Sequence, residues 1–545
     1  MTAQLPGGPH EPTVDVVLPS GLLPGTGTER SSRASGWLAA WIVARKLDLV
    51  VLAAVVTPVA IAHAWGMTRY PAFFDDEGTY VSQAYAVDNL HVLAPYAYWY
   101  DHPPLGWLLL GAWAKLFPVF SATLFAIAAA RMLILLLLIV SSGLVYGIAR
   151  RLGVRRSLSG FATLLFGLSP LAIHYQRMVL LDNIAVAWLL AAFFLALTPR
   201  RRLAAYAGSA LCLAAAVLTK ETFLLFLPAI AYMIWTTCPA TTRRFAVAVF
   251  GALFFCTAGF YPLFAALRGE LLRGVHHTSL MDGIRFQLER RGGGSILAAG
   301  SGTQSLADTW LDLDPILLGF SIPLIPVLLA VRRLRPVGIA LAVPVAMALR
   351  PGSYIPAMYV VGLLPFAAIA VPAVSEEAVR WSRRDHQRFA AAGKIAGALA
   401  AVALVAAPAA IAAPLWMKRD GQMFSTNDVS ADERAVDWLA AHVSPDSTLL
   451  VDNTIWTDLV QRGFERHRTV WFYKLDLDPA VRMPWWRFDY VVRSNIFAGN
   501  LYWLPQSRLV FDHSEPVAVF TTKHERVEIR RVVQPQPAIH RYRAE

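Results

Sequence analysis

Charged side chains are scarce in this sequence. Only 16% of its 545 residues are Asp, Glu, Lys or Arg, whereas 56% are hydrophobic. Soluble domains carry about a quarter of charged residues, so this shortage excludes an ordinary soluble protein. Long apolar runs extend from about residue 47 to residue 415, and the segment after them has the mixed composition of a globular domain. The composition therefore predicts a bundle of membrane helices followed by one soluble domain.

Cysteine is also rare. The three cysteines, Cys212, Cys238 and Cys256, lie in or beside apolar runs, so a disulfide in the C-terminal domain is excluded. The chain shows no convincing nucleotide-binding motif, and its start lacks the charged-then-apolar layout of a signal peptide. The first residues are rich in Pro, Gly and Ser, which predicts a disordered cytoplasmic tail over 1–44.

Positive charge is concentrated in short loops. The net charge is +12, but many arginines lie between apolar runs, as in ARRLGVRR (149–156), VRRLR (331–335) and SEEAVRWSRRDHQR (375–388). Loops rich in Arg and Lys stay on the cytoplasmic side of a membrane. The basic excess therefore indicates topology, and we expect no nucleic-acid partner.

Eleven apolar segments have the length or composition of membrane spans, for which about 20 apolar residues are needed. This count puts every Arg-rich loop on one side, with the N-terminus inside and the C-terminus outside. The expected spans are 47–66, 131–149, 158–174, 183–198, 203–219, 221–237, 245–267, 313–331, 337–349, 355–373 and 391–415. Outside lie the loop 67–130, with a short amphipathic segment at 105–118, the loop 268–312, and the C-terminal domain 416–545.

The first outer loop holds adjacent carboxylates in PAFFDDEGTY (71–80), namely Asp75, Asp76 and Glu77. Like charges packed together are unfavourable unless a cation, a metal or a substrate proton offsets them. The cluster is either a solvated acidic loop or the site of a general base that takes a proton from an acceptor hydroxyl. Further along, His102 follows Asp101 in a turn that two prolines make rigid, which predicts either a capped turn or a group that orients a phosphate.

Other ionisable residues are expected at the same outer face. Arg177 and Asp182 lie in HYQRMVLLDN (174–183), with almost no loop to solvate them. Lys220 forms a tight turn with Glu221, either as a closing ion pair or as a phosphate ligand. Arg350 precedes the tenth span and could hold a phosphate with two parallel hydrogen bonds. Together these residues supply carboxylates to activate a hydroxyl and cations to stabilise a departing phosphate.

At these residues the sequence resembles the GT-C superfamily of lipid-dependent glycosyltransferases. It is most similar to the branch that contains protein O-mannosyltransferases and the lipid A aminoarabinose transferase. The resemblance covers residues 45–415, which it identifies as a transmembrane catalytic domain. It is carried by five motifs in order: Asp76-Glu77, HPPLG (102–106), RMVLLDN (177–183), LTK (218–220) and the Tyr-rich span from Tyr354 to Phe366.

The resemblance implies a polytopic α-helical protein of about 11 membrane helices with a small extracytoplasmic α/β domain, multi-pass in the plasma (inner) membrane. It implies inverting transfer of a hexose or pentose from a polyprenyl-monophosphate sugar to a lipid, glycan or protein acceptor. The implied roles are Asp76, or its neighbour Asp75, as catalytic base, Glu77 and Asp182 to orient the acceptor or a metal, Lys220, Arg177, Arg350 and His102 for the donor phosphate, and Tyr80 and Tyr354 as aromatic contacts. A divalent metal at Asp76, Glu77 and Asp182 is left open, because some relatives use one and others do not.

Two further segments and two other functions complete the expectations. RRGGGS (290–295) predicts either a mobile lid or a plain connector. The C-terminal domain should hold helices at 431–443 and 454–464 and strands at 447–453, 487–493, 516–521 and 525–531, with Ser430 and Glu433 as a capping box. A transporter of lipid-linked sugar is the main alternative, although no internal repeat is visible. A membrane scaffold for an exported domain is the third.

Overall fold

The structure is a computed structural model that describes residues 27–121, 124–198, 202–274, 278–289, 292–350, 352, 354–383 and 390–534. It divides into two compact units, residues 1–51 and residues 52–545. Helix α1 (Gly27–Ala64) begins at Gly27, so the expected disordered tail over 1–44 is wrong from residue 27 onward. No proline interrupts the stretch 27–46, which lets the helix extend ahead of the apolar run. Residues 1–26 of the expected tail lie outside the described residues.

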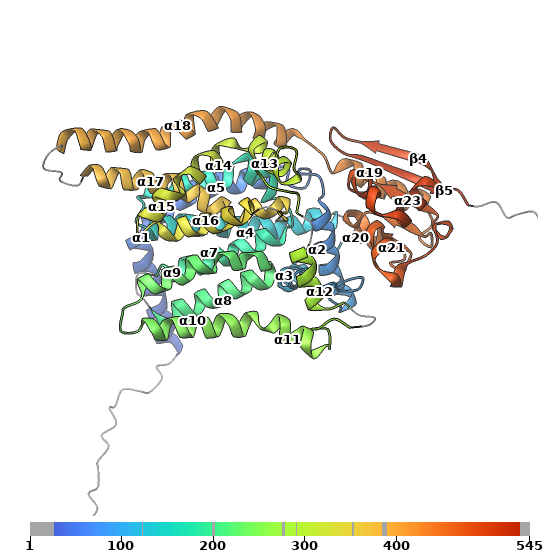
Figure 1. The fold of residues 1–545 in the computed structure, drawn as a ribbon, viewed down its shortest axis with the longest axis horizontal. Helices are drawn as coiled ribbons and strands as arrows, with labels where there is room; N and C mark the ends of the chain where they lie inside the picture. The colour runs from blue at the N-terminus through green and yellow to red at the C-terminus, as the bar shows by residue number, and fades with distance from the viewer. Residues whose placement is uncertain are drawn as a thin grey trace, which may run out of the picture. The chain divides into compact units, whose positions relative to one another are not determined.

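Each of the eleven expected spans coincides with helix. Besides α1, the helices that coincide with these spans are α4 (Ala126–Arg151), α5 (Arg156–Leu168), α6 (Pro170–Tyr175), α7 (Leu181–Ala196), α8 (Leu203–Thr219), α9 (Leu227–Thr237), α10 (Arg243–Ala258), α11 (Phe260–Leu267), α14 (Pro315–Ser321), α15 (Ile325–Ala330), α16 (Arg335–Leu349), α17 (Leu364–Arg383) and α18 (Ala390–Ser425) (Figure 1). Among the described residues, five helices are long and apolar enough to cross a membrane, or six if one bent pair counts as a span. Five further apolar helices are shorter, so a total of eleven crossings stays a prediction.

The bent pair joins α13 (Gly302–Leu313) to the helix that starts at Pro315, with an angle of 107° between them. Asp314 causes the break, because its side chain accepts hydrogen bonds from the backbone N–H groups of Ile316 and Leu317 and so starts a new helix. Proline at the next position fits only the first turn of that helix. The bundle core is apolar around α7, where Leu189, Leu190 and Phe193 are fully buried.

The polar segments that are expected outside the membrane form short helices. Helix α2 (Asp75–Tyr85) begins with three acidic residues, which suit the positive end of a helix dipole. Helix α3 (Leu105–Leu116) is the amphipathic segment expected at 105–118, and it starts directly after a Pro-Pro pair. Helix α12 (Leu280–Glu289) lies in the second outer loop. Its Gly283 packs so closely on Tyr100 that a Cβ there would lie 2.4 Å from the Tyr100 carbonyl oxygen.

The C-terminal region (the α/β domain) holds the expected mixture of strands and helices, and its independence as a domain stays a prediction. Its strands β1 (Leu449–Val451), β2 (Thr469–Trp471), β3 (Tyr490–Arg493), β4 (Ser514–Thr521) and β5 (Arg526–Val532) form one sheet in the order β2-β1-β3-β5-β4. Strands β2, β1 and β3 run parallel, and β5 pairs antiparallel with β3 and β4. Helices α19 (Ser430–His442), α20 (Asn453–Gln461), α21 (Phe472–Leu477), α22 (Asn495–Asn500) and α23 (Pro505–Asp512) accompany it.

Two details of this domain differ from the expectations. Strand β2 was missed, because three residues are too few to show an alternating pattern. The capping box is wrong, because Val429 occupies the N-cap of α19 and Ser430 is already helical. Asp452 caps α20 instead, since its side chain accepts from the backbone N–H of Thr454. Helix α18 also continues past the expected domain boundary at 415, to Ser425.

The α/β domain packs directly on α2 and on the start of α4. The Asn453 amide donates to the Asp75 carbonyl oxygen at 2.7 Å and to Thr79 Oγ1 at 2.8 Å. Gly78 makes this approach feasible, because a Cβ there would lie 2.6 Å from the backbone nitrogen of Thr454. Asp458 accepts from the backbone N–H of Ala126 at 2.9 Å and so caps α4. The domain thereby holds the acidic first turn of α2 in place.

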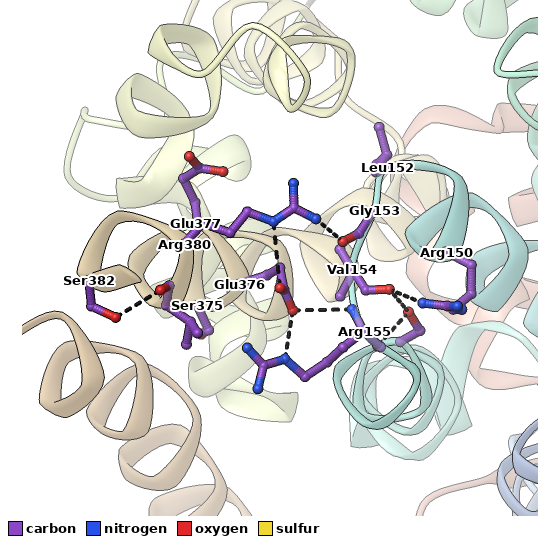
Figure 2. Close-up of polar contacts among 12 residues, drawn as sticks. Arg150, Leu152, Gly153, Val154, Arg155, Ser375, Glu376, Glu377, Arg380 and Ser382 are labelled. Carbon is purple, nitrogen blue, oxygen red and sulfur yellow. Dashed lines mark hydrogen bonds and ion pairs between the residues drawn. The ribbon is translucent and has the colours of Figure 1, made fainter. Parts of the chain in front are cut away.

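The Arg-rich loops meet at the other end of α4. Arg155 donates to Glu376 from Nε at 2.8 Å and from its backbone N–H at 3.1 Å (Figure 2). Arg333 pairs with Glu377 at 2.6 Å and donates to the Leu152 carbonyl oxygen at 2.8 Å. Residues of all three basic loops therefore lie together, as far as the structure describes them. The last of these loops is described only to residue 383.

Candidate active site

A cavity of about 960 Å³ lies between polar segments of the bundle and the α/β domain. Its walls come from α2, the loop before α3, the turn between α8 and α9, helix α12, the segment that precedes α17, and helix α21. Polar and aromatic lining residues include Asp75, Asp76, Tyr80, Trp99, Asp101, His102, Lys220, Glu221, Tyr354, Tyr473 and Lys474. The cavity is large enough for a sugar and part of a lipid carrier, since drug-sized ligands occupy about 300–1,000 Å³.

The two aspartates of α2 differ in their surroundings. Asp76 lines the cavity and accepts a long hydrogen bond from Tyr80 at 3.4 Å. Asp75 Oδ1 is buried without a hydrogen-bond partner among the described residues. Burial, with the charges of Asp76 and Asp452, raises the pKa of Asp75 to about 8, although Asn453 opposes the shift. A protonated Asp75 cannot take up a proton at neutral pH, which favours Asp76 over Asp75 as the candidate base.

Lys220, His102 and Glu221 form a hydrogen-bonded chain. Lys220 Nζ lies 2.9 Å from His102 Nε2, and His102 Nδ1 lies 2.9 Å from Glu221 Oε2. An ammonium at Lys220 donates to Nε2, which leaves the imidazole proton on Nδ1 to donate to Glu221. The tight turn thus places Glu221 against His102 rather than against Lys220. Glu221, not Asp101, is the carboxylate that orients the imidazole.

The backbone at His102 is also held from outside its own turn. Its carbonyl oxygen accepts from the hydroxyls of Tyr98 at 2.6 Å and Tyr261 at 3.1 Å.

Lys220 is 97% buried, and a buried cation needs compensating charge. Asp182 supplies it from the first turn of α7, where its charge stabilises the Lys220 ammonium more than that of any other neighbouring carboxylate. Asp182 does not line the cavity, so its charge compensates that of Lys220 from the side away from the cavity.

Glu77 has a different role from the one expected. Its Oε1 accepts from Arg131 Nε at 3.0 Å and from the Val179 backbone N–H at 2.7 Å. Its Oε2 accepts from Arg131 at 2.7 Å and from the Phe74 backbone N–H at 3.1 Å. Both side chains are fully buried, and both oxygens of the carboxylate are saturated. Glu77 therefore has no lone pair left for an acceptor or a metal.

This arrangement does not fit the expected metal site. Glu77 is occupied by Arg131, and Asp182 lies outside the cavity that Asp76 lines. Among the described residues, no group of three or more His, Cys, Asp or Glu side chains is placed to hold a metal ion. Arg131 was missed by the sequence analysis. A lone arginine near the outer end of an apolar run was the signal that could have identified it.

Arg177 is also structural. It is fully buried, and its guanidinium donates to the Ala62 carbonyl oxygen at 2.6 Å and to that of Trp65 at 3.0 Å, with a longer contact to Tyr70. Cations near the last carbonyls of a helix stabilise its C-terminus. Arg177 thus caps α1 and does not line the cavity, contrary to its expected role at the donor phosphate. The other expected cation, Arg350, is exposed at the end of α16 and does not line the cavity either.

The two expected aromatic contacts do reach the cavity. Tyr80 lies one helical turn beyond Asp76, and Tyr354 is partly exposed at the edge of the lining. The α/β domain also contributes to the lining, with Trp471, Tyr473 and Lys474, which was not predicted from the sequence. The run WFYK directly after a strand was the available signal, but nothing in the sequence places that strand against α2.

Comparisons with known proteins concern the sequence family and the fold. Residues 101–263 match the family model described as dolichyl-phosphate-mannose-protein mannosyltransferase. No curated protein sequence matches the chain significantly. The structure of ArnT from Cupriavidus metallidurans bound to undecaprenyl phosphate is similar, with a TM-score of 0.53 at 15% identity over 91% of this chain and 98% of that chain. The Archaeoglobus fulgidus oligosaccharyltransferase in the apo form aligns with a TM-score of 0.50 at 11% identity, over 86% of this chain and 74% of that one.

At these identities the two structures show the fold alone, and the family match covers the segment that contains His102 and Lys220. The family match therefore supports a resemblance to mannosyltransferases of this kind over residues 101–263, and the two structures add a shared fold over most of the chain.

Proposed function

We propose that the chain is an inverting glycosyltransferase that moves a sugar from a polyprenyl monophosphate to an acceptor hydroxyl. The observation that carries this proposal is that Asp76 and Lys220 line one cavity. A carboxylate and a buried ammonium are the two groups that displacement of a phosphate by a hydroxyl requires. The similarity to a structure with bound undecaprenyl phosphate supports a lipid-phosphate donor.

The reaction proceeds as a single displacement. The acceptor oxygen attacks the anomeric carbon from the face opposite the phosphate, and the bond from that carbon to the phosphate oxygen breaks. The electron pair leaves with the polyprenyl phosphate, and the acceptor proton passes to Asp76. Lys220 has two N–H groups left after its bond to His102, and these stabilise the charge on the departing phosphate.

The cavity belongs to the non-cytoplasmic face in this proposal, with residues 45–415 as the catalytic domain in the inner membrane and 416–545 outside. The arrangement of α4 supports it, because the Arg-rich loops adjoin the end of this helix at Arg151 and the α/β domain caps its start at Ala126. A helix of 26 residues is about 39 Å long and spans the roughly 30 Å hydrocarbon core of a bilayer.

The test is sugar transfer by the purified full chain in lipid vesicles. Radiolabelled decaprenyl-monophosphate hexoses and pentoses serve as donors, and extracted cell-envelope glycans, lipids and proteins serve as acceptors. We expect one donor to yield a labelled glycoside, and Asp76→Asn to lower the rate roughly 10²- to 10⁴-fold, the usual contribution of a general base. The exposed Asp312 provides the matched control, Asp312→Asn, which should leave the rate unchanged.

Two results would contradict the proposal. Full activity in Asp76→Asn would show that Asp76 is not the general base. Movement of the labelled donor across the vesicle membrane, without any glycoside product, makes the chain a transporter of lipid-linked sugar instead.

A further inference from the structure

Lys474 is a second buried cation in the wall of the same cavity, and the reaction proposed above does not use it. Lys474 is 91% buried, yet its side chain lines the cavity. Among the described residues, no hydrogen bond or ion pair engages its Nζ. A buried ammonium without a partner is unfavourable, so this placement requires an explanation.

The surroundings of Lys474 hold the cation without neutralising it. Its Nζ lies 4.8 Å from the ring centroid of Trp99 and 5.8 Å from those of Tyr96 and Tyr473. Aromatic faces attract a cation but leave its N–H donors free for a ligand. Trp99 and Trp471 also line the cavity, and their indole N–H groups are buried with no acceptor in the segments that the structure describes.

Carboxylates near Lys474 are present but already engaged or distant. Burial lowers the pKa of Lys474, and the charges of Asp101 and Asp478 oppose that shift. Both oxygens of Asp478 accept backbone hydrogen bonds, from Ala97 at 3.3 Å and from Ala480 at 3.0 Å. Asp101 lines the cavity without an ion pair to Lys474 within 4.0 Å. These charges therefore offset part of the effect of burial, and they leave the hydrogen-bond donors of Lys474 available.

The fold places Lys474 where ligands of α/β domains bind. Helix α21 follows β2, and α20 follows β1, so Lys474 and Asn453 both lie beyond the carboxyl ends of parallel strands. Ligand sites in open α/β sheets occur at this edge. In this protein the edge faces α2, because Asn453 binds the Asp75 carbonyl oxygen and Tyr473 contacts Thr79 at 3.2 Å.

We propose that Lys474 binds an anionic group of the acceptor, a phosphate monoester or a carboxylate, while Lys220 binds the donor phosphate. This inference rests on the proposed function for the identity of the second ligand as the acceptor. The two cations come from different parts of the chain, Lys220 from the end of α8 and Lys474 from the α/β domain. The domain thus selects an acidic acceptor and orients its hydroxyl toward Asp76.

The experiment measures ligand-induced thermal stabilisation of the purified full chain, with and without saturating decaprenyl monophosphate. Methyl phosphate and acetate are the soluble anion probes, and chloride at equal ionic strength is the blank. A ligand that binds only the folded state raises the melting temperature with its concentration. We expect one or both probes to stabilise the wild type in the presence of the lipid. Lys474→Met should raise the half-maximal probe concentration about tenfold or more, as loss of a charge-assisted hydrogen bond implies.

Three further variants make the result specific. Lys523, an exposed lysine of the same domain, gives the matched control Lys523→Met, which should respond as the wild type does. Lys474→Arg keeps the charge and should retain the anion response, which guards against a mere loss of folding. Lys220→Met should weaken decaprenyl-phosphate binding, whereas Lys474→Met should leave it within twofold.

The titrations with methyl phosphate and with acetate distinguish the two classes of acceptor. A response to methyl phosphate alone identifies a phosphorylated acceptor, and a response to acetate alone identifies a carboxylate such as a uronic acid. No response to either anion in the wild type, an unchanged response in Lys474→Met, or loss of lipid binding in Lys474→Met overturns the proposal. Failure of decaprenyl phosphate to bind the wild type contradicts the proposed function instead, and the anion titration without lipid still tests Lys474.

Discussion

The two charged regions at the ends of α4 differ in how their charges are satisfied. Where α4 ends, Arg155 pairs with Glu376 (Figure 2). Arg333 pairs with Glu377 and donates to the Leu152 carbonyl oxygen. Near its start, Asp75 Oδ1 and Lys474 Nζ have no hydrogen-bond partner within the described part of the chain, and Lys220 keeps two N–H groups for a ligand. Saturated charges stabilise the bundle, whereas unsaturated ones around a cavity are those that can act on a substrate.

The same contrast exists between adjacent residues of α2. Glu77 is saturated by Arg131 and two backbone N–H groups, while Asp76 keeps an open side toward the cavity. Position in a motif therefore does not determine function within it. The neighbours of the side chain do.

The largest expected effect on stability follows from breaking the saturated pair. Glu77→Gln leaves the fully buried Arg131 without its counter-charge, which should cost about 3–5 kcal/mol of unfolding free energy. Thermal unfolding in detergent measures this loss. Asp76→Asn, one residue away, should unfold within a few degrees of the wild type. Equal destabilisation by the two substitutions would remove the distinction between them.

Loss of Lys220 should act on the donor and not on the fold. Lys220→Met removes charge-assisted hydrogen bonds worth about 1.5–3 kcal/mol, so the affinity for decaprenyl monophosphate should fall roughly 10- to 150-fold. Binding to the purified protein measures the change. Lys523→Met is again the control. An unchanged affinity in Lys220→Met would assign the phosphate to another cation, with Lys474 as the first candidate.

A smaller effect is expected at the saturated end. Glu376→Gln weakens a partly exposed pair with Arg155, and such pairs contribute about 1 kcal/mol or less. Thermal unfolding should shift slightly, and the rate of sugar transfer should match that of the wild type once both proteins are folded. A substantial loss of transfer in this variant would mean that the two ends of the bundle are coupled.

The smallest effect on activity is expected for Asp75→Asn. The pKa of Asp75 is raised to about 8 in the folded protein, so this carboxyl is mostly neutral at pH 7 and an amide resembles it. Because the folded state holds the proton more tightly than the unfolded state, stability falls as pH rises from about 4 to about 8. The variant lacks this dependence.

The gain in melting temperature of Asp75→Asn over the wild type should therefore grow between pH 5 and pH 8. Transfer at pH 7 should stay within about threefold of the wild type. A complete loss of transfer in Asp75→Asn, with activity retained in Asp76→Asn, would exchange the roles of the two aspartates.

Much of the fold could be predicted from the sequence, because apolar runs and Arg-rich loops indicate which segments meet lipid and which meet water. Each such segment carries that information in its own residues. The same pattern predicted that Asp76, His102 and Lys220 lie close together, and all three line one cavity. The roles of Glu77 and Arg177 could not be predicted, because each depends on a partner far away in sequence, Arg131 for the one and the end of α1 for the other. Lys474 was missed for the same reason, since its place depends on how the α/β domain docks.

The close approach of Gly78 to Thr454 sets a limit on how this architecture can be recombined. A chimaera that takes its C-terminal domain from another enzyme must match the surface of α20 to that of α2, because no side chain fits at the point of contact. The contacting surfaces of α2 and α20 must therefore change together, although more than 360 residues separate the two helices in the sequence. Designs that exchange the domain to change the acceptor should exchange α2 with it.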